Sequence, residues 1–145
     1  MPHNMDVVTE QEHQMQKSNE LRNVILNGYK AMGSGDIGWW ERHLSKGAGA
    51  VMIGTDPSEW WAGHASILDA VRPQVKALAG SVMEGDPQAY VEGTLGWYAD
   101  QVQWKLPNGS VLSARVTGVC TKEEGEWKFL QSHFSIGVPN EEAFG

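Results

Sequence analysis

Two short stretches of the sequence hold side chains whose types and spacing could do chemistry. Residues 53–63 read IGTDPSEWWAG and place the carboxylate of Asp56 just before two adjacent tryptophans. Residues 126–137 read EWKFLQSHFSIG and fit an alternating β-strand. Because side chains two apart on a strand share a face, His133 and Ser135 are predicted to lie on the same face as the aromatic residues before them. The two stretches predict an aromatic-lined pocket.

Asp56 and His133 are the candidate proton-transfer groups. Asp56 precedes a proline, and Asp-Pro commonly forms a turn in which the carboxylate accepts a backbone N–H. The alternative is a general base at the cavity mouth, with its pKa raised by the neighbouring tryptophans. An imidazole titrates near neutral pH and suits an acid or a base, but a buried neutral histidine fits the same pattern. In an enzyme, these groups would abstract a proton beside a carbonyl, as in isomerisation, cyclisation or dehydration.

Tryptophans are candidates for the apolar wall of a binding site. The chain has seven in 145 residues, and a tryptophan combines a large apolar area with one N–H, which suits cores, pockets and interfaces. Consecutive residues at a helix start point about 100° apart. We therefore expect one of Trp60 and Trp61 in the core and the other in a pocket or an interface. Trp97 is a further candidate, and Trp40 is assigned to the core.

Asp100 and Arg115 are predicted to be neighbours across a hairpin. The Asn-Gly pair at residues 108–109 predicts a two-residue turn, which places Asp100 opposite Thr117 and Arg115 diagonal to Asp100. The two side chains would form an ion pair that braces the sheet. If they face the cavity instead, Arg115 would fix a substrate carboxylate. Strict alternation puts Trp97 and Asp100 on opposite faces and leaves open which of them faces inward.

Composition excludes several classes of partner. Hydrophobic residues make up 41% and charged residues 20%, which favours a folded globular protein. The net charge of −7 argues against nucleic acid, because phosphate binding needs a basic face. The histidines lack metal-ligand spacing, and the lone Cys120 allows no internal disulfide. With neither a signal core nor a membrane-spanning run, we expect a cytoplasmic protein without a membrane partner.

The spacing of apolar residues predicts helices first and strands later. Helices are expected at about 9–32, at 37–44, and at about 64–79, where Pro73 predicts a kink or an early break near Val71 and Arg72. Strands are expected at 50–53, 89–91, 95–106, 111–121 and 127–138. Helices on one face of an antiparallel sheet define an α+β domain. We expect a loose tail at 1–8 and a single domain at 9–145.

The motifs resemble those of a known superfamily. They are GSGD followed by WWERHL, the Asp-Pro turn, the Trp-Trp-Ala-Gly-His entry to the third helix, and the last hairpin with GEWK and His-x-Ser. Over residues 15–138 the chain resembles the nuclear transport factor 2-like superfamily, nearest its SnoaL-like and ketosteroid isomerase-like branches. The resemblance implies a cystatin-like, cone-shaped sheet wrapped around N-terminal helices, an apolar cavity, and commonly a homodimer through the outer sheet face.

The same resemblance can be followed to the isomerase machinery. Ketosteroid isomerases use an aspartate base, with a tyrosine and a protonated acid as the oxyanion hole. The base corresponds to Asp56 within a residue or two. The tyrosine position falls near Gly28, with Tyr29 one step away and expected on the wrong side, and the second acid falls near Thr117. With two of the three parts missing, the resemblance does not imply steroid isomerisation.

The sequence therefore predicts a protein that binds a small apolar or aromatic molecule in a cone cavity. It would either perform acid/base chemistry without a cofactor or metal, or act as a non-catalytic ligand sensor or dimerisation module. The candidate ligand-binding residues are Trp60, Trp61, Trp97, Asp100, Arg115 and Ser135. A cavity of a few hundred Å³ with an inward acid or imidazole would favour catalysis. A filled cone with tryptophans on the outer face would favour association.

Overall fold

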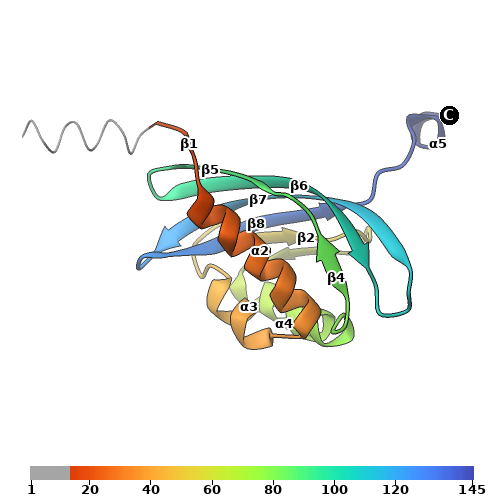
Figure 1. Cartoon of the computed structure of the whole chain (residues 1–145), viewed down its shortest axis with the longest axis horizontal. Helices are drawn as coiled ribbons and strands as arrows, with labels where there is room; N and C mark the ends of the chain where they lie inside the picture. Colours follow the sequence, from red (N-terminus) through yellow and green to blue (C-terminus); the bar gives the residue numbers. More distant parts are fainter. Residues whose placement is uncertain (1–13) are drawn as a thin grey trace, which may run out of the picture.

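The computed structural model describes residues 14–145 and shows helices packed on one face of a curved sheet (Figure 1). The strands are β1 (Gln16–Lys17), β2 (Val51–Ile53), β3 (Trp60–Ala62), β4 (Val82–Glu84), β5 (Gln88–Glu92), β6 (Leu95–Lys105), β7 (Val111–Glu123) and β8 (Glu126–Ser135). The helices are α2 (Asn19–Ser34), α3 (Ile37–His43), α4 (His64–Ala77) and α5 (Asn140–Phe144). The predicted α+β class is confirmed, while the tail predicted at 1–8 lies outside the described residues.

The strands form one sheet in the order β1-β5-β6-β7-β8-β2-β3, and β4 also pairs with β6. The meander from β5 to β8 is antiparallel, as predicted, whereas β2 runs parallel to β8. We call the sheet face covered by α2, α3 and α4 the inner face and the opposite one the outer face. In Figure 1 these three helices lie below the sheet, and α5 lies above it at the end of the chain.

Helix α2 is the long element that crosses the inner face. It begins at Ser18, whose Oγ accepts a hydrogen bond from Leu21 N at 3.0 Å. It ends at Gly35, whose φ of 71° closes the last turn. The prediction that this helix starts near residue 9 is wrong for residues 14–18, because β1 pairs there with β5 and the cap fixes the first turn. Residues 9–13 lie outside the described part of the chain.

Helix α4 runs unbroken through a proline. The early break predicted near Val71 and Arg72 is wrong, because the helix continues to Ala77. A proline removes one backbone donor and frees the carbonyl four residues earlier, here that of Asp69. Both Pro73 and Asp69 are exposed, so water can satisfy the freed carbonyl.

Trp60 and Trp61 were predicted to start a helix, but they lie on strand β3. Strand β3 pairs antiparallel with β2, with Ile53 opposite Trp60 and Met52 opposite Trp61. Alternation along the strand divides the two indoles between the faces. Trp61 is half-buried against the core, whereas Trp60 is 66% exposed.

Strand β8 changes face at Leu130. Cys120 pairs with Phe129 while Val119 pairs with Gln131, so Leu130 is an extra residue that forms a β-bulge. Phe129, before the bulge, is buried on the inner face, but His133, after it, is exposed on the outer face. The prediction that the whole strand shares one aromatic face is therefore wrong beyond Leu130.

The hairpin between β6 and β7 differs from the prediction by one residue. Leu106 N donates to Ser110 O at 2.8 Å, and Gly109 has a φ of 89°, so the loop has three residues instead of two. Gln101 consequently pairs with Arg115, and Asp100 pairs with Val116. A one-residue shift exchanges the faces. Asp100 faces inward and Arg115 outward, and the predicted ion pair between them does not form.

The core fills the space between the helices and the inner face. Phe129 is its centre, with its ring 5.3 Å from that of Trp40, 5.7 Å from that of Tyr98 and 6.2 Å from that of Trp39. The assignment of Trp40 to the core is confirmed. Further buried members are Leu21, Ile25, Tyr29, Met32, Leu44, Ile67, Val71, Val75, Val102, Val116, Cys120 and Trp127.

Candidate functional site

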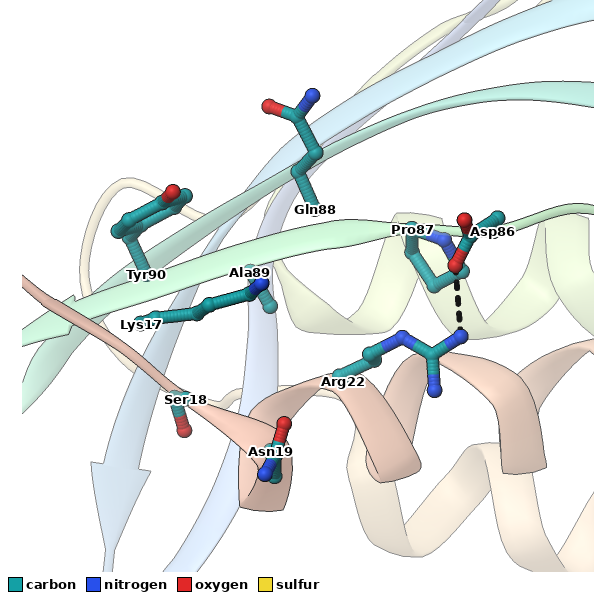
Figure 2. A pocket seen from close by; sticks show the side chains of 9 residues that line it. All are labelled: Lys17, Ser18, Asn19, Arg22, Asp86, Pro87, Gln88, Ala89 and Tyr90. Atoms are coloured by element: carbon teal, nitrogen blue, oxygen red, sulfur yellow. Dashed lines mark hydrogen bonds and ion pairs between the residues drawn. The ribbon is translucent and has the colours of Figure 1, made fainter.

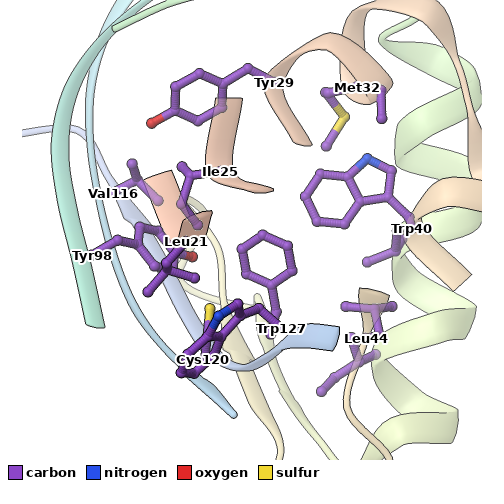
Figure 3. Close-up of a cluster of buried hydrophobic side chains, with 14 of the residues drawn as sticks. Leu21, Ile25, Tyr29, Met32, Trp40, Leu44, Tyr98, Val116, Cys120 and Trp127 are labelled. Carbon is purple, nitrogen blue, oxygen red and sulfur yellow. The ribbon is translucent and has the colours of Figure 1, made fainter. Parts of the chain in front are cut away.

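A small cavity lies between α2, α3 and the inner face. Its volume is about 20 Å³, enough for about one water molecule. Figure 3 shows several of the side chains that line this cavity, as part of the buried core. The lining residues are Ile25, Tyr29, Met32, Trp40, Met83, Tyr98, Val116, Phe129, Ser132 and Phe134. The cone is therefore nearly filled in this conformation.

Tyr98 and Ser132 supply a buried polar contact at the cavity wall. Their hydroxyl oxygens are 2.8 Å apart, on β6 and β8. Burial raises the pKa of the Tyr98 phenol far above its ordinary value, so this group stays protonated at neutral pH. The pair offers hydroxyl groups to a polar atom of a ligand but no base.

Tyr29 points inward and contacts Asp100. Its hydroxyl donates to Asp100 Oδ2 at 2.7 Å. Burial, followed by the hydrogen bond and the charge of Asp100, raises the pKa of Tyr29 far above its ordinary value. The expectation that Tyr29 faces the wrong side is wrong, because it follows Ile25 by four residues and shares its helix face. That spacing is the sequence signal that could have identified it.

Asp100 closes a break in the edge of the sheet. Strands β4 and β5 both pair with β6, and the chain leaves the ladder between them at residues 85–87. Asp100 Oδ1 accepts from Asp86 N at 3.1 Å and from Gln101 N at 2.8 Å. Gly85 fits here because a Cβ would overlap the Asp100 carboxylate. The Asp100 carboxylate thus accepts three hydrogen bonds and links the sheet edge to Tyr29 of α2.

Trp40 presents a buried donor without an acceptor. It is only 9% exposed, and its Nε1 has no hydrogen-bond partner among the described residues. Figure 3 shows this nitrogen on the side of the indole that faces Met32. An unsatisfied buried N–H costs about 1–3 kcal/mol, so a bound acceptor at this position would be favourable. Other buried groups without a partner are Trp104 Nε1, Trp127 Nε1 and Ser81 Oγ.

Asp56 lies in an exposed turn after β2. Its Oδ1 accepts from Ser58 N at 2.8 Å and from Ser58 Oγ at 2.5 Å. These bonds lower the pKa of Asp56, the reverse of the shift that a general base near tryptophans would need. The turn that the Asp-Pro sequence predicts is present, and the carboxylate does not line the interior cavity.

Most of the other predicted site residues lie on the outer face. His133 pairs with Thr117, and Ser135 pairs with Arg115. Trp97 stacks on Tyr90 with ring centroids 5.0 Å apart and planes 16° apart. These side chains do not line the interior cavity, so the structure separates them from it. Of the predicted site residues, Asp100 and Trp61 face inward.

A larger hollow of about 210 Å³ lies where α2 begins beside β5 (Figure 2). Arg22 Nη2 is 2.7 Å from Asp86 Oδ1 across it, and the Asp86 side chain is almost fully exposed. An exposed ion pair of this kind contributes little to stability. The hollow is lined by Lys17, Ser18, Asn19, Arg22, Asp86, Pro87, Gln88, Ala89 and Tyr90. It opens to solvent and shares no residue with the interior cavity.

Two kinds of site are not found in residues 14–145. No group of three or more His, Cys, Asp or Glu side chains is placed to hold a metal ion. Cys120 is buried, and burial raises the pKa of its thiol to about 12, so it is no nucleophile at neutral pH. Within the same residues, no helix has the length and apolar character needed to cross a membrane.

Comparison with known proteins gives a family and a fold. A family model described as a SnoaL-like domain matches residues 21–139. None of the curated proteins compared matches the sequence. A nuclear transport factor 2-like protein of unknown function from Pseudomonas putida KT2440 is 15% identical, with a TM-score of 0.73 over 85% of this chain and 88% of that one.

Two further solved structures carry names that suggest activities of their own. A proposed dehydratase from Streptomyces avermitilis is 16% identical, with a TM-score of 0.67 over 83% of this chain and 95% of that one. A proposed ketosteroid isomerase from Parabacteroides distasonis ATCC 8503 is 17% identical, with a TM-score of 0.62 over 81% and 87%. At such identities the likeness shows the fold alone, which confirms the predicted nuclear transport factor 2-like architecture.

Proposed function

Since the chain belongs to the SnoaL-like domain family, whose fold also serves isomerases and dehydratases, we propose that its interior binds a small apolar or aromatic molecule without transforming it. Ligands of such proteins occupy concave, mostly apolar sites with a few polar contacts. The interior cavity has this composition, with aromatic and aliphatic walls and a few hydroxyl and indole donors. This composition fits a carrier or a ligand sensor, while the small volume and the outward Trp60 and Trp97 meet the criterion stated above for an association module.

The observation that carries the proposal is the absence of a usable base in the cavity lining. None of its ten residues is an acid, a histidine or a cysteine. Its two phenols, Tyr29 and Tyr98, have pKa values raised far above the ordinary value and remain neutral. Acid/base catalysis needs a group that exchanges protons near the working pH. This lining supplies hydrogen-bond donors and contact area.

Trp40 indicates the polar feature of the ligand. Its buried N–H has no acceptor, so a ligand oxygen placed against it would remove a desolvation cost. A cavity of about 20 Å³ must widen before a ring can enter. Met32 and Met83 line it, and unbranched methionine side chains rearrange readily. We therefore propose an aromatic ligand with one oxygen acceptor, admitted by movement of these side chains.

Purification under native conditions followed by mass spectrometry should identify the molecule that travels with the protein. In parallel, 1-naphthol can be titrated into the delipidated full chain by calorimetry. Trp40→Phe keeps the ring but removes the donor, and should weaken 1-naphthol binding about fivefold, the value of one hydrogen bond. The matched control Trp60→Phe changes an indole that is 66% exposed and should leave the affinity unchanged.

The pH dependence gives an independent check. Because the cavity lining has no group that ionises near neutrality, the affinity for neutral 1-naphthol should be constant between about pH 6 and pH 8. Equal weakening by Trp40→Phe and Trp60→Phe would contradict the assigned site. A protein that carries no ligand when purified and does not bind 1-naphthol at millimolar concentration would remove the proposal.

A second function, proton transfer in an isomerase, cyclase or dehydratase, is favoured by one observation. Tyr29, at the cavity wall, donates its hydroxyl hydrogen to Asp100 Oδ2, with 2.7 Å between the oxygens. If the co-purified molecule is converted, Tyr29→Phe should lower kcat, whereas Asp56→Asn and His133→Ala should leave turnover unchanged because both residues face away from the cavity. Turnover lost in the latter two variants would restore the predicted pair as the catalytic residues.

A further inference from the structure

The hollow beside the start of α2 brings two cations to one depression of the surface. Its volume is about 210 Å³, the space that about seven water molecules take up in the liquid. Lys17 of β1 and Arg22 of α2 line it, and Asp86 is the one acid among the described residues of its lining (Figure 2). The hollow therefore has an excess of positive charge, although the chain as a whole has a net charge of −7.

Much of the hydrogen-bonding capacity of this lining is unused. The Lys17 ammonium has three donors, yet it forms no hydrogen bond or ion pair with residues 14–145. The Arg22 guanidinium has five N–H donors, and the bond from its Nη2 to Asp86 Oδ1 at 2.7 Å uses one of them. The side-chain amides of Asn19 and Gln88 form no hydrogen bond within the same residues. Such a surplus of donors suits a ligand with several anionic oxygens.

The ion pair between Arg22 and Asp86 marks a carboxylate position that a ligand can take over. The Asp86 side chain is 89% exposed and that of Arg22 35%. Because an exposed pair of this kind contributes little to stability, a second carboxylate can replace Asp86 on the guanidinium at little cost. The backbone of Asp86 stays in place in that event, since its N–H donates to Asp100 Oδ1 at 3.1 Å.

The two cations are held apart along the segment that leads into β5. In Figure 2 the Lys17 ammonium lies near Ala89, whereas the Arg22 guanidinium lies near Asp86. The lining between them is apolar, because Pro87 and Ala89 are buried there. A compact inorganic ion reaches one cation at a time. A short carbon chain with an acid group at each end can reach both and cover the apolar part between them.

We propose that this hollow binds a small linear dicarboxylate, with one carboxylate on Arg22 in place of Asp86 and the other on Lys17. The methylene groups of the ligand lie over Pro87. The start of α2 forms one wall, and the positive end of a helix adds to the attraction for an anion. The hollow and the interior cavity share no residue, so this proposal does not depend on what the interior binds.

Calorimetric titration of the full chain at low ionic strength should give a dissociation constant for glutarate of about 1 mM or below. Valerate keeps the carbon chain but lacks one carboxylate, and it should bind at least about tenfold more weakly. Equal affinities for the diacid and the monoacid would overturn the proposal. So would inorganic phosphate bound as tightly as glutarate, or no binding of glutarate at about 10 mM.

Substitutions assign the two carboxylates to their partners. Arg22→Gln should weaken glutarate binding about tenfold, and Lys17→Gln about threefold because the lysine is more exposed. Asp86→Asn should strengthen it about threefold, since the competing carboxylate is removed. The matched control Arg72→Gln changes an arginine that is likewise paired with an acid, Glu41, and should leave the affinity unchanged. Weaker binding in Asp86→Asn, or an equal loss in Arg72→Gln, would overturn the assignment.

Amide chemical shifts locate the bound diacid. Glutarate should shift the signals of Asn19 and Ala89 most, and those of Thr117 on the outer face and Ser132 in the interior cavity least. Largest shifts outside the hollow would overturn the placement. Circular dichroism verifies that each variant is folded. Arg22→Gln should bind 1-naphthol as the wild type does, because it does not line the interior cavity, so the two proposed sites can fail separately.

Discussion

Both faces of the sheet carry aromatic side chains, but these side chains are packed into the core on the inner face and partly exposed on the outer face. On the inner face, aromatic rings from α3, β6 and β8 interlock around Phe129 and leave about 20 Å³ of free volume. On the outer face, Trp97 and Tyr90 stack in partial exposure beside polar neighbours. The predicted ionisable site residues are divided between the faces, because His133 and Arg115 lie outward whereas Asp100 faces inward and is bound by Tyr29. The imidazole and the guanidinium predicted for the site thus lie on the side opposite the cavity, and the phenols of Tyr29 and Tyr98 remain at its wall.

This division teaches that composition alone does not locate a site. Seven tryptophans suggest an indole-lined cavity, yet Trp60 points to solvent and Trp61 contributes to the core. The pairing register of each strand decides which of its side chains face the helices and which face outward. The inner face should respond to changes in volume more than the outer face. The following predictions test that contrast.

The largest effect is expected from Phe129→Ala. Phe129 is buried and contacts three aromatic rings, so its removal leaves a void and should lower the free energy of unfolding by about 4 kcal/mol. Gln131→Ala, two residues further along β8 but exposed, should change it by less than about 0.5 kcal/mol. Urea denaturation measures both. Equal losses would contradict the assignment of the faces.

A smaller effect is expected from Gly118→Ala on β7. A Cβ there would overlap the carbonyl oxygen of Gln131 and the ring of Tyr98. Since a backbone atom cannot move aside cheaply, we expect a loss of about 2 kcal/mol. The neighbouring exposed Thr117→Ala serves as the control and should be nearly neutral. A thermal melt that shows Gly118→Ala as stable as the control would mean that the strand has more room than the structure indicates.

Tyr29→Phe should cost about 1 kcal/mol, because it removes one donor from Asp100. The pKa of Tyr29 is raised in the folded protein, so its contribution is complete below the unfolded value of about pH 10 and is lost as pH rises. The variant should therefore lose less stability than the wild type between about pH 9 and pH 11. Tyr90→Phe, on the outer face, is the control. Identical alkaline profiles for Tyr29→Phe and the wild type would refute this linkage.

Ser58→Ala should have the smallest effect. The hydrogen bonds from Ser58 lower the pKa of Asp56, so loss of the hydroxyl should move that pKa back toward its ordinary value. The stability that ionised Asp56 contributes is present above the pKa of Asp56 in the unfolded chain. It is lost as the pH falls through the lower pKa of Asp56 in the folded protein. Carbon-13 NMR of the carboxyl measures the shift, with Ser66→Ala, exposed on α4, as the control. An unchanged pKa in Ser58→Ala would mean that other donors hold the carboxylate.

The sequence predicts most helices and strands, but it does not predict which side chains of each strand face the helices. The apolar spacing of α2 and the long hairpin could be predicted because local patterns determine them. Two small irregularities could not. A third loop residue before Ser110 and the extra Leu130 each reverse a face, and both depend on the pairing register of adjacent strands, which the spacing of apolar residues does not encode. Strand β3 escaped prediction because three residues are too short a pattern.

The bulge at Leu130 has a consequence for how this protein is compared with its relatives. Residues before and after it belong to different layers, so the two halves of β8 should be aligned separately. A relative without this one residue would have the rest of the strand turned over, with the imidazole at 133 directed at the ligand chamber. Deletion of this one residue would therefore turn the imidazole from the outer face toward the interior, and reinsertion would reverse the change.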